Sequence, residues 1–323
     1  MRWGLPALAA LLLFYPFIFT GPFYWDIGVA FLLAAISASA WNIVGGYAGQ
    51  VSVGHAVFFG FGAYSSVVVY TQLGWPPIAG APIGMALSVA VAAVIGVPTL
   101  RLSGHYFSMA TIAVAELVRV LSSTSEFLGG AQGLGGPAMP RTVFDLSFIS
   151  AAPFYYIFLG VLAFLLWLTW RMENGRIGFY LRAIKDSERA ARSLGVSAGR
   201  YKLYAYMMSG AFTALAGSLY LCMFGFVDPE SGFGILISVK MVVMAALGGA
   251  GQLFGPLVGA LILVPLEELS NSYLGGRGAG LTFVVYGAII VIIARFLPSG
   301  LLSLFERRPA RQPKSDVARG HAD

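Results

Sequence analysis

The stretch Glu173-Asn-Gly-Arg-Ile-Gly-Phe-Tyr-Leu-Arg-Ala-Ile-Lys-Asp-Ser-Glu-Arg-Ala-Ala-Arg-Ser-Leu-Gly195 is a charged island in an otherwise apolar chain. From Arg171 to Lys202 the island holds eight lysines or arginines and three acids, and apolar sequence long enough to cross a bilayer flanks it on both sides. The positive-inside rule puts so basic a loop in the cytoplasm. The island at 172–202 therefore fixes the orientation of the predicted helices around it.

The composition places most of the chain in lipid. Of its 323 residues, 58% are hydrophobic and 11% are charged, whereas a soluble domain carries roughly 25% charged residues. No Asp, Glu, Lys or Arg occurs between Ile27 and Leu100. Because 13 of the 20 basic residues lie at 171–202 and 307–319, the net charge of +6 indicates topology and lipid contacts and excludes nucleic acid as the partner.

Hydropathy predicts an all-α fold, a polytopic membrane helix bundle of about 8–10 transmembrane helices. The candidate spans are 5–20, 27–45, 53–72, 78–100, 105–122, 154–170, 204–226, 235–249, 253–269 and 281–297. With the island inside, this count puts both termini in the cytoplasm. The first apolar run is interpreted as a retained span because no small-residue cleavage site follows it.

The chain is expected to form one transmembrane domain over residues 1–305, followed by a disordered basic cytoplasmic tail over 306–323. The span count places the Gly- and Pro-rich segment 123–153 outside, where it either docks an external partner or is a plain surface loop. The single cysteine, Cys222, excludes an intrachain disulfide and is expected to be buried and inert.

A short motif recurs in both halves of the chain. Gly46-x-x-Gly49-Gln50-Val51 returns as Gly248-x-x-Gly251-Gln252-Leu253, each copy between two apolar spans. Transporters with two related halves carry glycine-interrupted helices at corresponding positions near the substrate site. Irregular backbone at membrane depth survives only where it faces protein or water. The echo therefore predicts two related halves with a pathway at the interruptions; two ordinary cytoplasmic turns are the alternative.

Polar side chains inside the predicted spans are the candidates for a translocation path. They either face a water-filled route or form hydrogen bonds between helices. For Glu116 a third interpretation exists, because Arg119 lies three residues on and can pair with it on one helix face. The candidate set is Asn42, Gln50, Ser52, His55, Glu116 and Gln252.

Catalytic and metal-binding patterns are missing from the sequence. The scattered His55, His105 and His321 lack metal-ligand spacing. The spacing Gly49-x-x-x-x-Gly54 resembles a phosphate-binding loop but is followed by His55-Ala56 in place of the required lysine. No metal site, nucleotide site or catalytic residue is predicted.

Residues 179–194 are predicted to form one amphipathic helix within the island. Leu181, Ile184, Ala191 and Leu194 share a face, and Gly195 is placed as the terminator. Such a helix either enters a groove on a partner or lies on the anionic leaflet. The charge alone does not separate these two interpretations.

Four stretches of the chain resemble the branched-chain amino acid permease family of ATP-binding-cassette importers. They are Trp41–Tyr64, Leu100–Thr111 together with Glu116, Gly175–Gly195 and Val243–Gln252, and the ending Arg295–Leu301 also fits. The resemblance implies a coupling loop that docks on a separate ATPase. Its residues would be Asp186, Glu188, Arg189, Ala190, Ala191 and Gly195. The order Glu-Arg-Ala-Ala departs from the Glu-Ala-Ala of other importers, which leaves the role of Glu188 open.

The resemblance further implies an assembly in the bacterial inner membrane that works by alternating access. This chain would be joined by a second, homologous permease subunit, two ATPase subunits and a periplasmic solute-binding protein. ATP and Mg would be held by the ATPases, so no cofactor and no enzymatic activity are expected on this chain. The implied solutes are branched-chain or related amino acids, with urea or short amides as the alternative.

Two other functions stay open at this point. A self-contained secondary transporter would need intramembrane carboxylates, for which Glu116 and the pair Glu267-Glu268 are the candidates. A membrane-embedded enzyme would need a catalytic constellation that the sequence does not show.

Overall fold

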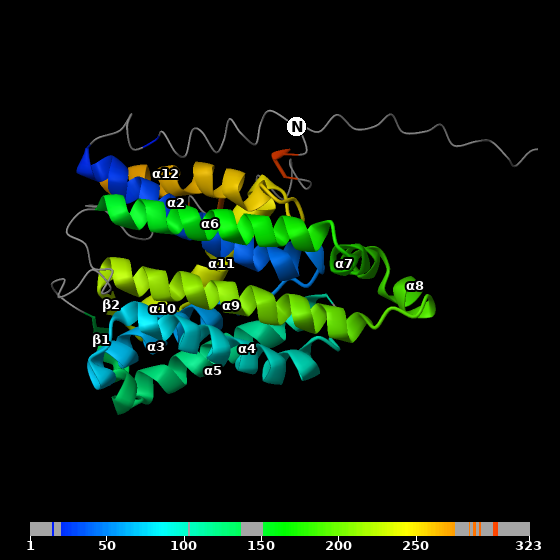
Figure 1. The fold of residues 1–323 in the computed structure, drawn as a ribbon, viewed down its shortest axis with the longest axis horizontal. Helices are drawn as coiled ribbons and strands as arrows, with labels where there is room; N and C mark the ends of the chain where they lie inside the picture. Colours follow the sequence, from blue (N-terminus) through cyan, green and yellow to red (C-terminus); the bar gives the residue numbers. More distant parts are fainter. Residues whose placement is uncertain are drawn as a thin grey trace, which may run out of the picture.

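The bundle is all-α, and its long helices run side by side along one axis (Figure 1). The computed structural model describes Tyr15, residues 21–102, 104–136 and 151–274, and isolated positions between 284 and 302. Within these residues, seven helices are long and apolar enough to cross a membrane. The predicted polytopic helix bundle is confirmed. The predicted spans 5–20 and 281–297, the segment 137–150 and the tail 306–323 lie outside the described residues, apart from isolated positions.

The helices agree with eight of the ten predicted spans to within a few residues. The long helices are α2 (Pro22–Asn42), α3 (Ala56–Leu73), α4 (Gly80–Thr99), α5 (His105–Thr124), α6 (Ala151–Glu173), α9 (Ala198–Phe224), α11 (Ile235–Gly248) and α12 (Gly255–Leu274). The shorter elements are a π-helical turn (Ile43–Tyr47), α7 (Arg176–Asp186), α8 (Glu188–Ser193), α10 (Pro229–Phe233), the 3₁₀ turns Pro77–Ala79, Glu126–Leu128 and Gly130–Gln132, and the strands β1 (Leu134–Gly135) and β2 (Phe226–Val227).

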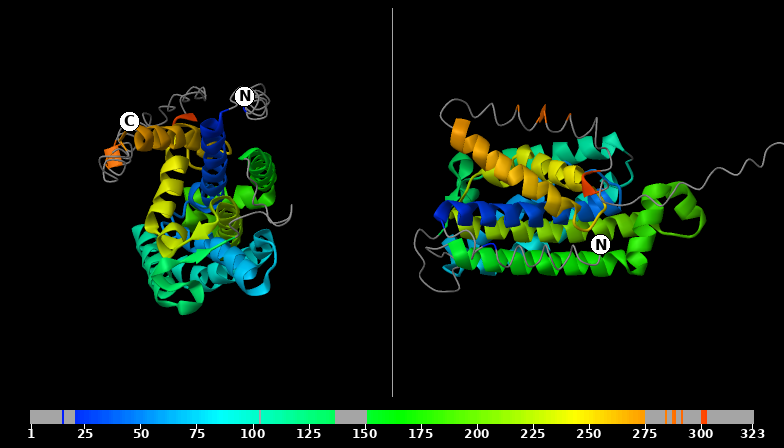
Figure 2. Two further views of the ribbon diagram at one scale, coloured as in Figure 1. Left: turned by 90° about the vertical axis from the view of Figure 1, so that its left-hand side faces the viewer. Right: turned by 90° about the horizontal axis from the view of Figure 1, so that it is seen from above.

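Helix α2 forms the centre of the bundle. It is apolar on every side, and Val29, Leu32 and Ile36 are completely buried. It contacts α6, α9, α11 and α12. A helix that is hydrophobic all round is buried by its neighbours on every face. Seen along the bundle, α5 and α12 lie on opposite sides with α2 and α9 between them (Figure 2).

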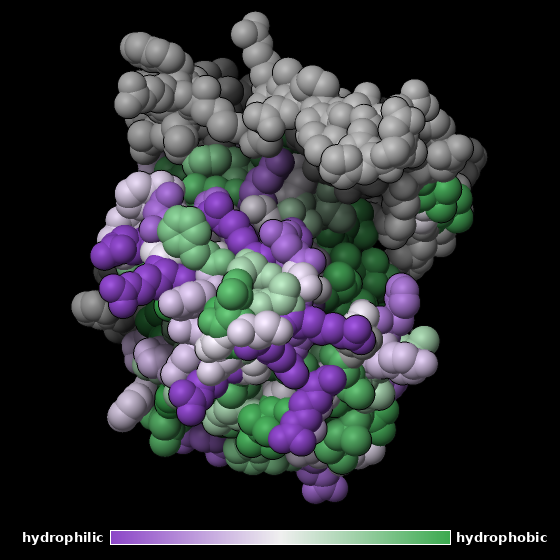
Figure 3. Space-filling model, turned by 90° about the vertical axis from the view of Figure 1, so that its right-hand side faces the viewer, coloured by the Kyte–Doolittle hydropathy of each residue, from purple (hydrophilic) through white to green (hydrophobic). Residues whose placement is uncertain are grey.

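The two ends of the bundle differ in chemistry. Helices α7 and α8 project from one end, called the basic end below, and the β1–β2 pair lies at the other (Figure 1). Hydrophilic side chains gather on the basic end (Figure 3). β1 pairs antiparallel with β2, with Leu134 opposite Val227. The island and the described part of segment 123–153 therefore lie at opposite ends of the bundle.

Helices α3, α4 and α9 pack closely because glycines face one another's backbones. A Cβ at Gly62 of α3 would collide with the carbonyl oxygen of Ala214 on α9. A Cβ at Gly217 of α9 would collide with the carbonyl oxygen of Phe59 on α3. Small residues allow this approach, which supplies van der Waals contact where lipid gives no hydrophobic drive for association.

This packing predicts different outcomes for alanine at two glycines of α9. Gly217→Ala is expected to lower the thermal midpoint of the detergent-solubilised protein by about 3–10 °C, because overpacking against backbone costs about 1–3 kcal/mol. Gly199→Ala is the control, because a Cβ there meets nothing within 4 Å. The control should leave the midpoint unchanged or raise it, since alanine is the better helix former. Equal midpoints for the two variants would contradict the close packing.

Candidate functional site

The first break, residues 43–55, interrupts the bundle between α2 and α3. Helix α2 passes into the π-helical turn Ile43–Tyr47, and Gly49 takes a φ of 69°. The chain then runs without helical structure until α3 begins, and Ser52 and His55 are completely buried in this part. π-helical turns inside α-helices are frequent at functional sites. The first break is thus longer than an ordinary turn and partly enclosed by protein.

Neighbouring helices satisfy the backbone of the first break. Thr111 Oγ1 of α5 accepts a hydrogen bond from Val53 N at 3.1 Å. Ser238 Oγ of α11 accepts one from Ala56 N at 2.8 Å. Unpaired backbone groups cost several kcal/mol in a bilayer, so these hydroxyls allow the chain to remain non-helical here.

His55 makes a buried polar contact between three helices. Its Nε2 lies 2.8 Å from Ser209 Oγ of α9, and that hydroxyl donates to the carbonyl oxygen of Ala40 on α2 at 2.7 Å. Because a serine hydroxyl has one hydrogen, His55 Nε2 must be the donor to Ser209. The other ring nitrogen, Nδ1, is then an acceptor, and no donor reaches it within the described residues.

The second break, residues 249–254, lies against the first. Asn42 at the end of α2 donates from Nδ2 to the carbonyl oxygen of Gln252 at 3.0 Å. Its Oδ1 accepts from Gly251 N at 2.8 Å. Gly46 packs so tightly against this turn that a Cβ there would collide with Gly251 N. The two echoed motifs are therefore in direct contact at Gly46 and Gly251, and the Asn42 carboxamide holds the second motif in place, an arrangement that the sequence did not predict.

Two glutamines of the echoed motifs keep unused acceptors at the breaks. The Oε1 atoms of Gln50 and Gln252 are buried, and neither has a hydrogen-bond donor among the described residues. Buried polar groups normally find partners. Such acceptors can take a hydrogen bond from a solute or from water.

Lys185 connects the island to the breaks. This residue lies on α7, and its Nζ donates to the carbonyl oxygen of Gly46 at 2.7 Å. Its side-chain stem packs against Gly49, and its Nζ lies close to Gly251. Sequence reasoning missed this residue. The signal was weak: Lys185 is the one lysine among the arginines of residues 171–201.

Glu116 is engaged in ion pairs on another face of the molecule. Its carboxylate accepts from Arg119 Nη2 at 2.5 Å and from Nε at 2.9 Å. Arg119 also reaches Glu230 of α10 at 3.4 Å. The ion pair expected between Glu116 and Arg119 is confirmed. The structure therefore brings Asn42 and Gln252 together, with Ser52 and His55 in the first break, but not Glu116.

The island contains two helices, so the prediction of one helix over 179–194 is wrong. The break falls at Ser187, whose Oγ accepts a hydrogen bond from Ala190 N at 3.4 Å and caps α8. Three residues of the predicted apolar face, Leu181, Ile184 and Ala191, are buried. The fourth, Leu194, is 84% exposed because the chain turns away after Ser187. Gly195 ends the segment with a φ of 85°, as predicted.

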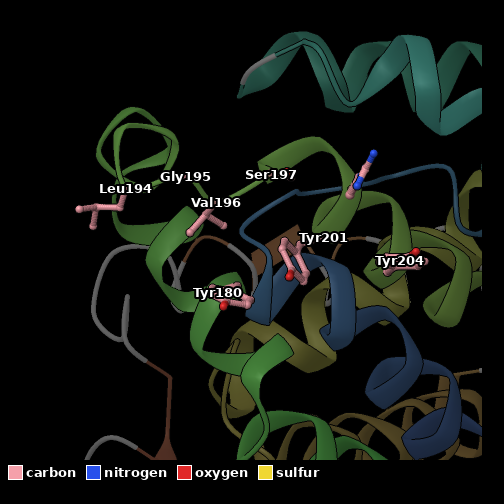
Figure 4. A pocket seen from close by; sticks show the side chains of 8 residues that line it. Tyr180, Leu194, Gly195, Val196, Ser197, Tyr201 and Tyr204 are labelled. Carbon is pink, nitrogen blue, oxygen red and sulfur yellow. The ribbon is translucent and has the colours of Figure 1, made fainter.

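The predicted coupling residues differ in exposure. Asp186, Arg189, Ala190 and Gly195 are exposed, whereas Ala191 is buried against Ile184 and Ala198. Ala191 thus holds α8 onto its neighbours, and the exposed side chains of Ala190 and Leu194 are the ones available to a partner. Beside them lies a cavity of about 340 Å³, and the ring centroids of Tyr180 and Tyr201 in its lining are 4.7 Å apart (Figure 4).

Glu188 clamps α8 to the start of α9. Its carboxylate pairs with Lys202 Nζ at 2.5 Å and with Arg192 Nη2 at 2.6 Å, and the Lys202 side chain is only 3% exposed. Partial burial would raise the pKa of Glu188, but Lys202 and Arg192 outweigh it and hold that pKa below its ordinary value. Glu188 therefore makes a structural contact between α8 and the start of α9.

Comparison with known proteins gives one consistent family. The family described as "Branched-chain amino acid transport system / permease component" matches residues 24–294. The chain is 30% identical to the high-affinity branched-chain amino acid transport system permease protein LivM of Escherichia coli (strain K12), over 91% of this chain and 73% of that protein. It is 24% identical to LivH of the same strain, over 83% and 90%. The autoinducer 2 import system permease protein LsrC of Klebsiella pneumoniae is 28% identical over 53% of this chain and 48% of its own length.

The Glu188 clamp predicts that α8 loosens in acid. A carboxyl whose folded-state pKa is depressed stabilises the structure above its ordinary value, here 4.5, and loses that contribution as the pH falls through the folded-state value. A dye on Leu194→Cys in a Cys222→Ser background should keep constant anisotropy from pH 7 to about 4.5 and lose it below. The same protein with Glu188→Gln should show low anisotropy throughout. A flat titration of the unaltered clamp would contradict the assignment.

Proposed function

We propose, from the premise that this chain belongs to the branched-chain amino acid transport permease family, that it is the LivM-type permease subunit of an ATP-driven importer. It moves a small polar solute across the bacterial inner membrane by alternating access. We take branched-chain or related amino acids as the solute class, because LivM and LivH carry that description. Urea or short amides are the alternative, and the likeness to an autoinducer 2 permease underlines that the family's solutes vary.

The contact of Lys185 with Gly46 is the observation that carries this proposal. It joins a helix outside the predicted spans to the break that precedes α3. Asn42 extends the connection to the second break through Gly251 and Gln252. A displacement of α7 would therefore act on both breaks at once. That is the coupling an importer needs if ATP is hydrolysed on a separate subunit at the cytoplasmic face.

The ATPase subunits would dock on the basic end. The exposed Ala190, Leu194 and Gly195 lie at the tip of the island, beside the cavity lined by Tyr180 and Tyr201. A protruding apolar side chain next to a recess suits a partner that covers both. ATP and Mg would bind on that partner and not on this chain. Both termini would then lie in the cytoplasm, and the periplasmic solute-binding protein would approach the opposite end, where β1 and β2 lie.

The second permease subunit would cover α5. This helix is the least buried of the seven membrane-spanning candidates, with 22% of its apolar window inside. Glu116 of α5 is half exposed on the same helix. A charge on a lipid-facing surface is costly, and such residues face protein or a water-filled cavity. The face of α5 that includes Tyr106, Met109 and Leu117 is therefore a candidate for the subunit boundary and the path along it.

A secondary transporter is the less favoured function. Its coupling-ion site would need a free intramembrane carboxylate. Glu116 is held by Arg119, and Glu267 is held by Lys240. These ion pairs occupy two of the three carboxylates that the sequence offered for such a site, and Glu268 is the third.

Replacing Lys185 tests the coupling. In liposomes containing the complete importer, Lys185→Met should cut solute uptake about tenfold or more, because a charged hydrogen bond contributes about 1.5–3 kcal/mol. ATP hydrolysis and complex assembly should persist. Lys185→Arg should restore much of the uptake, since arginine can also donate to Gly46. Arg101→Met, at the same end of the bundle, is the control.

The outcomes distinguish the importer function of the chain from the coupling role of α7. Absence of ATP-dependent uptake by the unaltered complex would overturn the importer function itself. Normal uptake with Lys185→Met would leave the importer function standing and overturn the coupling role of α7.

Replacing Leu194 tests the docking surface. Leu194→Asp should weaken binding of the ATPase subunits about tenfold or more, because it puts a charge at an apolar contact. Leu194→Met should bind normally, and pull-down of the ATPase subunits measures both. Ala191→Glu is a poor test, because Ala191 is buried and the variant would disturb α8 itself. Unchanged binding of Leu194→Asp would place the ATPase contact elsewhere on the island.

A further inference from the structure

A second cavity opens where α6, α7 and α9 meet. Its volume is about 430 Å³, and most of its lining is apolar. The apolar side chains come from all three helices: Leu168, Met172, Ile177, Ala205 and Met208. Small-molecule and cofactor sites have volumes of about 300–1,000 Å³, so the space is large enough to hold part of a ligand. The coupling contact does not use it, and the cavity beside the docking surface shares only Tyr204 with it.

Two arginines without carboxylate partners stand at the rim of this cavity. Arg171 lies in the last turn of α6, and Arg176 lies at the start of α7. Both are exposed, and neither forms an ion pair within the described part of the chain. The nearby Glu173 cannot neutralise them, because its carboxylate binds Arg182 and the Tyr47 hydroxyl. The cavity therefore combines an apolar floor with two uncompensated positive charges.

The cavity lies at the level of the membrane interface. One predicted span ends at residue 170 on α6, and the next begins at residue 204 on α9. Residues that line the cavity lie on either side of both positions. Trp167 and Trp170 are 55% and 52% exposed on α6, and Tyr204 at the cavity is 59% exposed. Exposed Trp and Tyr gather where headgroups meet acyl chains. Apolar residues of the lining thus adjoin the acyl region, and the arginines adjoin the headgroups.

We propose that this cavity binds one anionic phospholipid of the cytoplasmic leaflet. Part of an acyl chain lies against Leu168, Met172 and Met208, and the phosphate lies between Arg171 and Arg176. An acyl chain gains little by leaving other lipid tails for such a surface, because both environments are equally apolar. Selectivity must therefore come from the headgroup. Arginines bind phosphate oxygens through paired hydrogen bonds, and basic pockets between membrane helices bind anionic headgroups.

The membrane is the favoured source of the anion because the floor is apolar. A soluble phosphate or an acidic segment of the ATPase would use the arginines alone and would leave the slot between α6 and α9 unfilled. A phospholipid uses both parts of the cavity. This site does not depend on the proposed transport function and can be tested on the full chain alone.

Native mass spectrometry of the full chain with added lipid tests the proposal. One phosphatidylglycerol per chain should stay bound at collision energies that remove the other lipids, whereas phosphatidylcholine should dissociate. Arg171→Gln with Arg176→Gln should weaken phosphatidylglycerol binding about tenfold or more. The matched control is Arg101→Gln with Arg189→Gln, which removes the same charge from exposed positions outside the cavity. The control should retain the lipid.

Several results would overturn the proposal. Equal retention of phosphatidylglycerol and phosphatidylcholine would contradict selection by the headgroup. Equal loss of phosphatidylglycerol from the two double variants would mean that net positive charge attracts the lipid without a defined site. Full competition by millimolar inorganic phosphate would identify a soluble-anion site. Loss of ATPase binding in the cavity variant with unchanged lipid retention would assign the arginines to the ATPase contact.

Discussion

The carboxamide of Asn42 is the interaction on which the arrangement of the two breaks depends. Within the second break, it accepts a hydrogen bond from Gly251 N and donates one to the carbonyl oxygen of Gln252. Asn42 is also the last residue of α2, the helix that leads into the first break. The surroundings are buried, and an unpaired polar group there would cost about 1–3 kcal/mol. No other residue type of this size offers both a donor and an acceptor in one plane. Both interruptions of the bundle are therefore held in one place, against each other.

Much of the fold could be predicted from the sequence, because each apolar span can be recognised from its own residues without knowing what it packs against. Hydropathy located eight long helices, seven of which are long and apolar enough to cross a membrane, and the island at one end of the bundle. The island helix could not be predicted so well: Ser187 ends α7 by capping α8, and this stops the apolar periodicity before Leu194. The echo of Gly46 and Gly248 located both breaks. That the two breaks touch depends on how α2 and α11 pack, which spacing along the chain does not contain.

The candidate site was predicted by residue type more than by position. Asn42, Ser52 and His55 were singled out because they are polar within apolar sequence, and the side chains of all three are buried with hydrogen-bond partners. Glu116 met the same criterion but lies with Arg119 on another face. Lys185 lay in a segment where positive charge is abundant, so its charge carried no signal. Its contact with Gly46, which depends on how α7 packs against the first break, is what identifies it.

The two lysine contacts of the island differ in burial and in the charge of the partner. Lys202 is buried and paired with a carboxylate, so separating it from Glu188 would leave an uncompensated buried charge. Lys185 is exposed and donates to a neutral carbonyl, and water can replace Gly46 when the contact opens. The first contact keeps α8 and the start of α9 together as one body. The second contact involves an exposed side chain, so the proposed displacement of α7 would break it and leave the first contact intact.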